Sequence, residues 1–294
     1  MASEEVVIKK PFSGLKVFTA GIPLSTPPPQ NIYKGIDRLV ELELDGMEIE
    51  FVYGVNTNNS EMFKIGEYGK SKGVYFTAHA PYYINLNAKE EEKYIRSKEH
   101  IKKTVLALEK AGGWSAVFHP AFYTGDAPKT VLERVIKAIE EINTELKSLG
   151  HKFNVWIRPE TMGKPSQFGS LEEVVEISKC FDNVLPCIDF SHLYARSRGG
   201  YNSEKEILGI FDYIAKELGD KALKNMHIHL SGIEFGAKGE KFHNTFAETQ
   251  LNYKTIIKTF KHLKIEGVVV CESSNIEYDA MIIKNLYNSE VREV

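Results

Sequence analysis

The chain has 294 residues, of which 43% are hydrophobic and 26% are charged, and its formal net charge is −3. This composition is typical of a globular protein and excludes a fibrous or low-complexity chain. No apolar run approaches the roughly 18 residues that a membrane helix needs. The acidic balance argues against a protein that coats nucleic acid, but an enzyme that contacts a few phosphates needs only a local basic patch.

Short runs rich in Val, Ile, Phe or Tyr alternate with segments of helical periodicity along the whole chain. The runs predict β-strands over residues 15–20, 46–52, 74–80, 115–119, 153–160, 184–190, 225–231 and 267–272. The clearest helical segments are 32–44, 90–111, 130–148, 171–181, 203–218 and 251–263. Eight strands alternating with helices predict a parallel sheet. With no linker or repeat to divide the chain, we expect one (β/α)₈ barrel domain over residues 1–294.

Ionisable side chains stand at the ends of six consecutive predicted strands. They are His79, His119, Glu160, Asp189, His229 and Glu272, and His192 and His243 lie in the segments that follow Asp189 and His229. The carboxyl ends of barrel strands share one rim, where barrel enzymes carry their chemistry. A single histidine at a strand end is more often a satisfied polar residue than a ligand. Together, however, these acids would be costly to bury without a common counter-charge, so the pattern predicts divalent metal ions at the rim.

His227 needs a separate interpretation. It shares a strand face with His229, because alternate residues of a strand point the same way, and it should lie deeper in the barrel. We therefore expect His229 to be the ligand and His227 to support or pack against it.

These residues stand in stretches that resemble the endonuclease IV family of apurinic/apyrimidinic endonucleases. The matching stretches are residues 78–86, 118–120, 158–161, 187–192, 226–230 and 270–273, in the order of the family. The resemblance implies a barrel with three zinc ions that cleaves the DNA backbone 5′ to an abasic site. By position it implies one ion on His79, His119 and Glu160, a second on Glu160, Asp189, His229 and Glu272, and a third on His192 and His243. It makes Glu160 and Glu272 the expected catalytic carboxylates.

One position departs from the family pattern. The family has an Asp two residues before the last third-site histidine, whereas this chain has Lys241 two residues before His243. A protonated lysine cannot ligate a metal. Either the neighbouring Glu240 completes the third site, or that site is lost and Lys241 contacts a phosphate as a point charge. We therefore expect two zinc ions from the intact sites, with a third ion depending on Glu240, and manganese suits the same ligands.

The resemblance also implies contacts with double-stranded DNA. Tyr82 and Tyr83 match the loop that inserts into DNA, where an aromatic side chain can fill the gap left by a missing base. Packing of these rings on a neighbouring loop is the alternative. Arg196 and Arg198 follow the sixth strand and are candidates for phosphate contacts or for a solvated loop.

Two other function classes fit parts of the pattern. A sugar isomerase or epimerase of the xylose-isomerase-like barrel group also places Glu, Asp, His and Glu on strands five to eight. Such an enzyme has no need for His79, His119, His192 and His243, so their joint presence favours the phosphodiesterase. A protein that binds damaged nucleic acid without cutting it is the third alternative, and the intact first two sites argue against it.

The three cysteines and the amino terminus predict a cytoplasmic protein. Cys180, Cys187 and Cys271 are few, odd in number and set among apolar residues, which favours a reducing compartment. The first ten residues mix acids and bases and lack the apolar stretch of a secretory signal. We expect no membrane partner and favour a monomer.

Overall fold

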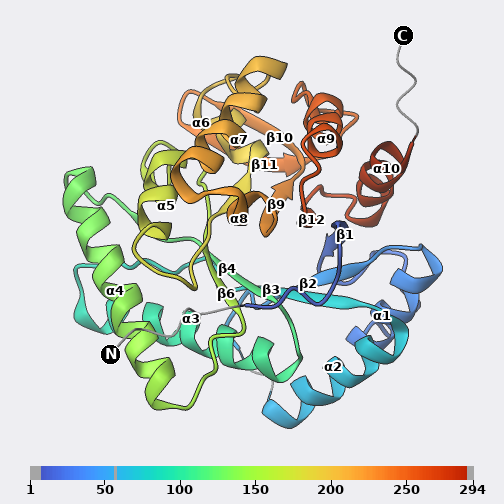
Figure 1. Cartoon of the computed structure of the whole chain (residues 1–294), viewed down its shortest axis with the longest axis horizontal. Coiled ribbons are helices and arrows are strands. Elements are labelled where there is room, and N and C mark those ends of the chain that lie inside the picture. Colours follow the sequence, from blue (N-terminus) through green and yellow to red (C-terminus); the bar gives the residue numbers. More distant parts are fainter. Residues whose placement is uncertain (1–7, 56–57, 290–294) are drawn as a thin grey trace.

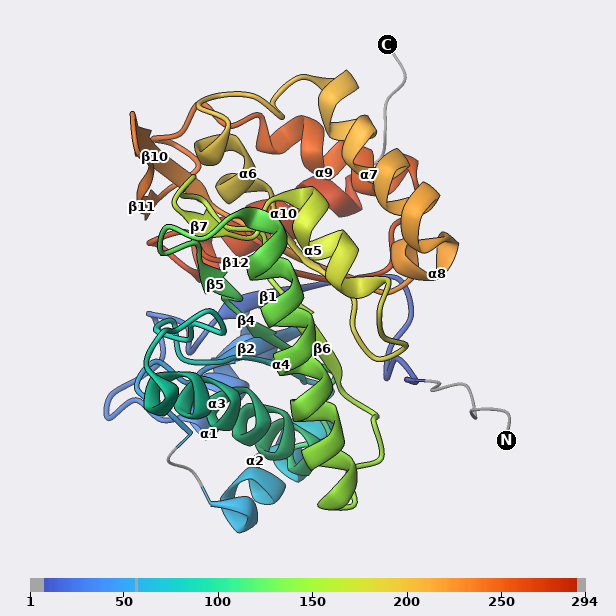
Figure 2. The same ribbon diagram turned by 90° about the vertical axis from the view of Figure 1, so that its left-hand side faces the viewer.

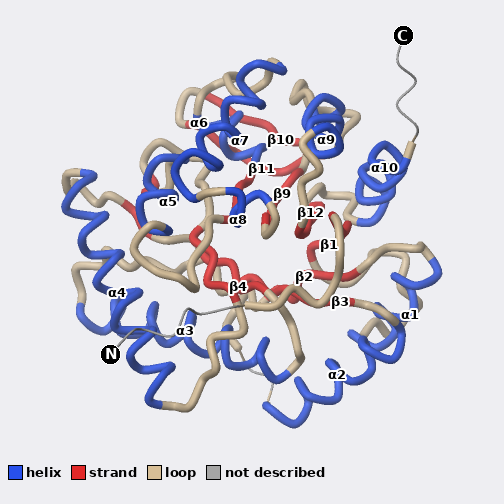
Figure 3. Tube along the Cα trace, in the orientation of Figure 1, coloured by secondary structure: helices blue, strands red, loops and turns tan. Residues whose placement is uncertain are grey.

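A parallel β-barrel forms the centre of the molecule, surrounded by helices (Figures 1 and 3). The structure, a computed structural model, describes residues 8–55 and 58–289. The barrel strands are β1 (Leu15–Ala20), β2 (Gly46–Glu50), β3 (Tyr75–His79), β4 (Ser115–Phe118), β6 (Trp156–Pro159), β8 (Cys187–Asp189), β9 (Met226–Leu230) and β12 (Gly267–Cys271). They are hydrogen-bonded in the order β6-β4-β3-β2-β1-β12-β9-β8. Isolated bridges from Ile157 to Val184 and from Glu160 to Cys187 join the two ends of this order. The predicted (β/α)₈ barrel is confirmed.

The helices cover the outside of the barrel with their apolar faces. They are α1 (Ile32–Glu41), α2 (Asn59–Lys72), α3 (Glu91–Lys110), α4 (Pro128–Ser148), α5 (Leu171–Ser178), α6 (Phe190–Arg196), α7 (Glu204–Leu218), α8 (Asp220–Leu223), α9 (Tyr253–His262) and α10 (Glu277–Asn288). Ser170 and Glu173 form a reciprocal capping box at the start of α5. No helix in the described ranges is long and apolar enough to cross a membrane.

Two short antiparallel pairs follow the carboxyl ends of the barrel strands. β5 (Ala121–Phe122) pairs with β7 (Gln167–Phe168), and β10 (Gly232–Gly236) pairs with β11 (Gly239–Asn244). Figure 2 shows both pairs on the same side of the barrel. The sequence did not predict either pair, because strands this short lack a readable alternation. The β10–β11 hairpin is important for the site, since it carries His243.

The close approach of β9 and β12 depends on a glycine. Gly267 begins β12 with φ +130°, and a Cβ at this position would lie 1.9 Å from the carbonyl oxygen of Met226. That oxygen belongs to the neighbouring strand, so it cannot move without disturbing the ladder. A side chain is therefore excluded both by space and by backbone conformation.

We predict that Gly267→Ala lowers the free energy of unfolding by at least about 2 kcal/mol, because the clash falls on the backbone. Urea denaturation monitored by circular dichroism measures the loss. The matched control is Gly209→Ala in α7, where a Cβ meets nothing within 4 Å. This control should be neutral or stabilise by up to about 1 kcal/mol, since alanine favours helix. Equal effects of the two substitutions would contradict the argument.

Candidate metal centre

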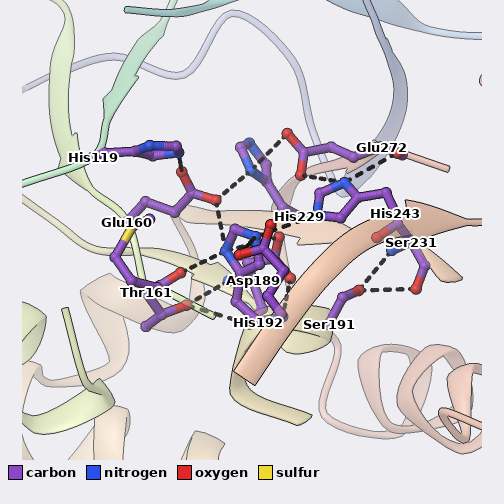
Figure 4. A network of polar contacts seen from close by, with 12 residues as sticks. His119, Glu160, Thr161, Asp189, Ser191, His192, His229, Ser231, His243 and Glu272 are labelled. Atoms are coloured by element: carbon purple, nitrogen blue, oxygen red, sulfur yellow. Dashed lines mark hydrogen bonds and ion pairs between the residues drawn. The ribbon is translucent and has the colours of Figure 1, made fainter. Parts of the chain in front are cut away.

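The Glu160 carboxylate lies at the centre of a group of histidines in the barrel mouth (Figure 4). Nε2 of His79 and Nε2 of His119 each lie 3.1 Å from its Oε2. Nδ1 of His229 lies 3.1 Å from its Oε1. Glu160 directly follows β6, and the three histidines come from the ends of β3, β4 and β9. The parallel strands thus deliver all four side chains to one rim, as the sequence predicted.

The other predicted ligands join the same group. The described residues include four sets whose ligand atoms all lie within 4.8 Å of one another. Three consist of predicted ligands: His79, His119 and Glu160; Glu160, Asp189, His229 and Glu272; and Asp189, His192 and His243. The fourth is Cys187, His227 and His229. The local fold explains how Asp189 and His192 come together. Asp189 is the N-cap of α6 and accepts a hydrogen bond from the backbone N–H of His192 at 2.8 Å, so both side chains lie on the first turn of that helix.

Backbone carbonyls hold three of the histidines in one orientation. Nδ1 of His79 donates to the carbonyl of Ala80 at 2.6 Å, and Nδ1 of His192 donates to that of Thr161 at 2.8 Å. Nδ1 of His243 lies 3.3 Å from the carbonyl of Glu272. A hydrogen on Nδ1 leaves the lone pair on Nε2, which is the arrangement that a metal-ligating imidazole needs.

The histidines supply positive charge to the buried carboxylates. Burial alone would raise the pKa of Glu160, but the charges of His229 and His119 outweigh it and hold that pKa well below the usual range. Burial alone would lower the pKa of His79, whereas its hydrogen bond to Glu160 and the charge of Glu160 raise it to about 10. Burial raises the pKa of Glu272 well above the usual range, and the charge of Glu160 adds to the rise. A metal ion would take over the counter-charge that these protons provide.

Two further observations show that the residues fit metal ions. Oδ2 of Asp189 is buried and has no hydrogen-bond partner among the described residues. Nε2 of His192 and Nε2 of His243 lie 3.3 Å apart, so a hydrogen or a cation has to lie between the two nitrogens. A cation between such atoms would satisfy all of them. Nitrogen and carboxylate donors without sulfur suit a divalent ion such as zinc or manganese.

The hairpin brings Glu240 towards the centre and turns Lys241 away. Oε2 of Glu240 lies 3.6 Å from Nε2 of His192, whereas Nζ of Lys241 lies 3.3 Å from Oε1 of Glu234 and its side chain is 55% exposed. The register explains this arrangement. Phe235 pairs with Glu240 and Glu234 pairs with Phe242, so Lys241 is the extra residue of a β-bulge. Skipping one residue places Glu240 on the same face as His243.

The residues that were predicted to contact DNA lie in different surroundings. Tyr82 is 55% exposed at the mouth and Tyr83 is 42% exposed beside it, with its hydroxyl donating to the carbonyl of Tyr53 at 3.2 Å. Both rings are therefore accessible at the rim. Lys164, which the sequence did not single out, lines the mouth together with Tyr82. Arg198 has φ +59° just after α6, and its side chain forms no hydrogen bond or ion pair with the described residues.

Arg196 makes structural contacts within the chain. Its Nη1 donates to the carbonyls of Lys164 at 2.7 Å and Gln167 at 2.9 Å, and its Nη2 donates to the hydroxyl of Tyr123 at 3.3 Å. The guanidinium is thus occupied by the loop that carries Lys164. Arg196 therefore holds this loop, and its contact with a phosphate stays a prediction.

Two carboxylates on β2, the buried Glu48 and the partly buried Glu50, were missed by sequence reasoning. Oε1 of Glu48 lies 2.9 Å from Nε2 of His229, and its Oε2 lies 3.1 Å from Nε2 of His227. Glu50 lines the mouth of the barrel, and burial raises its pKa to about 7. The available signal was the pair of glutamates two residues apart in an otherwise apolar strand, which places both on one face.

Comparison with known proteins places this architecture in a family. A model of the xylose isomerase-like TIM barrel matches residues 36–288. The chain belongs to the xylose isomerase-like TIM barrel family. An uncharacterized protein of Methanocaldococcus jannaschii is 43% identical over 92% of this chain and 96% of its own length.

Proteins with different names resemble the chain. A probable endonuclease 4 of Oceanobacillus iheyensis is 27% identical over 60% of this chain, and the match spans 59% of that relative's length. The structure of endonuclease IV from Thermus thermophilus covers 91% of this chain and 98% of its own, with a TM-score of 0.68 and 17% identity. A D-tagatose 3-epimerase-like protein covers 93% and 95%, with a TM-score of 0.67 and 18% identity. At these identities the two structures show a shared fold.

We predict that the protein as purified contains at least two divalent ions per chain, measured by elemental analysis. Glu160→Gln should lower this content more than His192→Ala does, because Glu160 belongs to two ligand sets and His192 to one. The glutamine keeps the size of the side chain while removing its charge. If the purified protein contains no metal and binds neither added zinc nor added manganese, the metal centre is refuted.

The hairpin yields a separate prediction. Glu240→Gln should weaken binding of one ion per chain, because Glu240 faces His192 and His243. Lys241→Ala, one residue further along the same strand, should leave metal content unchanged, since Lys241 is exposed and paired with Glu234. Titration with zinc against a chromophoric chelator measures both variants. The assignment fails if Lys241→Ala changes zinc binding and Glu240→Gln does not.

Proposed function

We propose that this member of the xylose isomerase-like barrel family is a zinc-dependent phosphodiesterase that cleaves the DNA backbone 5′ to abasic sites. The observation that carries the proposal is the set of histidines beyond the four-residue group of Glu160, Asp189, His229 and Glu272. His79 and His119 extend the group on one side, and His192 and His243 extend it on the other. The names of the endonuclease 4 relatives agree with this proposal.

Each part of the site has a task in such a reaction. Divalent ions bound at this centre would stabilise charge on the phosphate oxygens and activate water. Glu160 belongs to two of the ligand sets and would help to hold an ion in each. Glu240 would join Asp189, His192 and His243 in holding a further ion. Manganese can replace zinc on these donors.

The rim of the mouth suits the DNA around the lesion. Tyr82 is exposed beside the ligands and would fill the space of the missing base. Lys164 lines the same mouth and would meet a backbone phosphate as a point charge. Tyr83 is anchored through its hydroxyl to the Tyr53 carbonyl, and would hold the loop that presents Tyr82.

A metal-dependent sugar isomerase or epimerase is the second candidate. Glu160, Asp189, His229 and Glu272 form a ligand set by themselves, which is all that such an enzyme requires. The shared fold of the epimerase-like protein is compatible with this function. An isomerase would leave the two outer histidine pairs without a task, which is why the phosphodiesterase is preferred.

A cleavage assay on a DNA duplex with one abasic site tests the proposal. We predict metal-dependent cleavage on the 5′ side, lost on treatment with chelator and restored by zinc or manganese. Glu160→Gln should reduce the rate by at least about 100-fold, as expected when a group that positions the reacting atoms is removed. The control His262→Ala removes an exposed histidine from α9 and should retain the rate.

The same preparation is tested on ketohexoses for epimerisation. Turnover of a sugar without cleavage of the abasic duplex would establish the second candidate in place of the first. Tight binding of the abasic duplex with no turnover by metal-loaded protein would mean that the chain recognises damaged DNA without cutting it.

A further inference from the structure

A second group of polar side chains lies inside the barrel, below the ligands of the mouth. It consists of Glu48 on β2, Cys187 on β8, and His227 and His229 on β9. All four side chains are completely buried, and the Cys187 sulfur lies within 4.8 Å of a ring nitrogen of each histidine. Of the four residues, only His229 also belongs to a ligand set of the mouth. Polar groups at this depth are costly unless partners satisfy them.

The Glu48 carboxylate contacts both rings without forming a hydrogen bond to either. Its Oε2 lies 3.1 Å from Nε2 of His227, and its Oε1 lies 2.9 Å from Nε2 of His229. All four of these atoms are buried and lack a hydrogen-bond partner among the described residues. Buried polar atoms in proteins are nearly always hydrogen-bonded, because each unsatisfied one costs free energy. The contacts therefore leave four atoms that need a further partner.

A divalent ion is a partner that can satisfy these atoms together. Nitrogen and oxygen ligands about 2 Å from a tetrahedral zinc ion lie about 3.3 Å from one another, which is close to the two separations at Glu48. The Cys187 sulfur offers a further donor at the same place. Sulfur, imidazole nitrogen and carboxylate oxygen together suit zinc, whereas manganese prefers oxygen ligands.

Hydrogen bonds hold the ring of His227 in the orientation that such an ion needs. Its Nδ1 is hydrogen-bonded with Oγ of Ser115 at 2.8 Å, and the same Oγ accepts from Nε of Arg158 at 2.9 Å. Nη2 of Arg158 donates in turn to the carbonyl of Asn225 at 2.7 Å. A ligating histidine commonly has its second nitrogen hydrogen-bonded, which fixes the ring and directs the free nitrogen to the metal. The free nitrogen of His227 is Nε2, which faces Glu48.

We propose that the barrel interior holds a further zinc ion, bound by Cys187, His227, Glu48 and Nε2 of His229. This inner site does not depend on the reaction proposed above. Four protein ligands leave no open position on the ion, as in structural zinc sites, so the ion would join β2, β8 and β9 and would not bind substrate. On binding, the Cys187 thiol releases its hydrogen to solvent, because only a thiolate ligates zinc.

Absorption spectroscopy of cobalt-loaded protein tests the sulfur ligand. Cobalt(II) occupies zinc sites, and a thiolate bound to it gives a charge-transfer band in the near ultraviolet that nitrogen and oxygen ligands do not give. Wild-type protein titrated with cobalt should show this band, and Cys187→Ser should lose it. The matched control Cys271→Ser should keep the band, because Cys271 is equally buried and belongs to none of the ligand sets in the described residues. Cys180→Ser, which removes the exposed cysteine, should keep it too.

Elemental analysis of zinc-loaded variants tests the other ligands. Glu48→Gln and His227→Gln should each lower the zinc content by about one ion per chain, since each removes one ligand of the inner ion and none of those assigned to the mouth. Thr77→Val is the matched control, because Thr77 is also completely buried and its hydroxyl has no partner among the described residues. A wild-type protein without the cobalt band, a band that survives Cys187→Ser, or an unchanged zinc content in both Glu48→Gln and His227→Gln would overturn the proposal.

X-ray absorption at the zinc edge of the wild-type protein needs no variant, so it decides the matter even if the substitutions prevent folding. It should show sulfur at about 2.3 Å from zinc, a neighbour that the ligands assigned to the mouth cannot provide. A spectrum with nitrogen and oxygen neighbours alone would overturn the inner site. Cleavage of abasic DNA by such a protein would refute only this inference, whereas a sulfur neighbour in a chain that does not cleave would refute only the proposed function.

Discussion

The burial of the Glu160 carboxylate at the barrel mouth is the constraint on which the rest of the site depends. A carboxylate with 0% exposure is costly unless positive charge surrounds it. His79, His119 and His229 supply that charge from three different strands, each 3.1 Å away. Glu160 therefore connects elements that are distant in the sequence. The same requirement makes the centre suitable for metal ions, which satisfy several carboxylates and imidazoles at once.

The parallel barrel meets this constraint through the common direction of its strands. All carboxyl ends face one mouth, so a residue at the end of any strand is brought near residues at the ends of the others. The loops and the hairpin that follow the strands place the remaining side chains of the site. A bulge at Lys241 turns Glu240 towards His192. Arg196 holds the loop with Lys164 by donating to its carbonyls. The regular part of the fold positions the ligands, and these irregular segments shape what surrounds them.

The sequence predicted the barrel and the convergence of its ligands because both follow from local periodicity and strand direction. His79 and Asp189 end β3 and β8 as expected, and Glu160 follows β6 by one residue. Glu48 was missed because its partners lie on β9, which is not a neighbour of β2 in the sheet, so the pairing is made across the barrel interior. Glu240 was left as one of two alternatives, because the face of a hairpin residue depends on a bulge that has no local signature. The part that Arg196 plays in holding a loop was not predicted, because the carbonyls that it binds belong to a loop some thirty residues earlier.

An endonuclease IV and an epimerase-like protein share the fold of this chain, so the fold alone does not select a reaction. The four ligands Glu160, Asp189, His229 and Glu272 are equally uninformative, since an isomerase and a phosphodiesterase can both use them. The residues that distinguish the two reactions are the histidines on either side of this group. The outer histidines increase the charge that the centre can carry, which suits a phosphate diester more than a neutral sugar. The chain as a whole is acidic, with a net charge of −3, so the proposed phosphodiesterase would have to attract DNA through the mouth itself. In that proposal, positive charge at metal ions held by these residues and at Lys164 would attract the backbone to the site of cleavage, and the rest of the surface would not need to be basic.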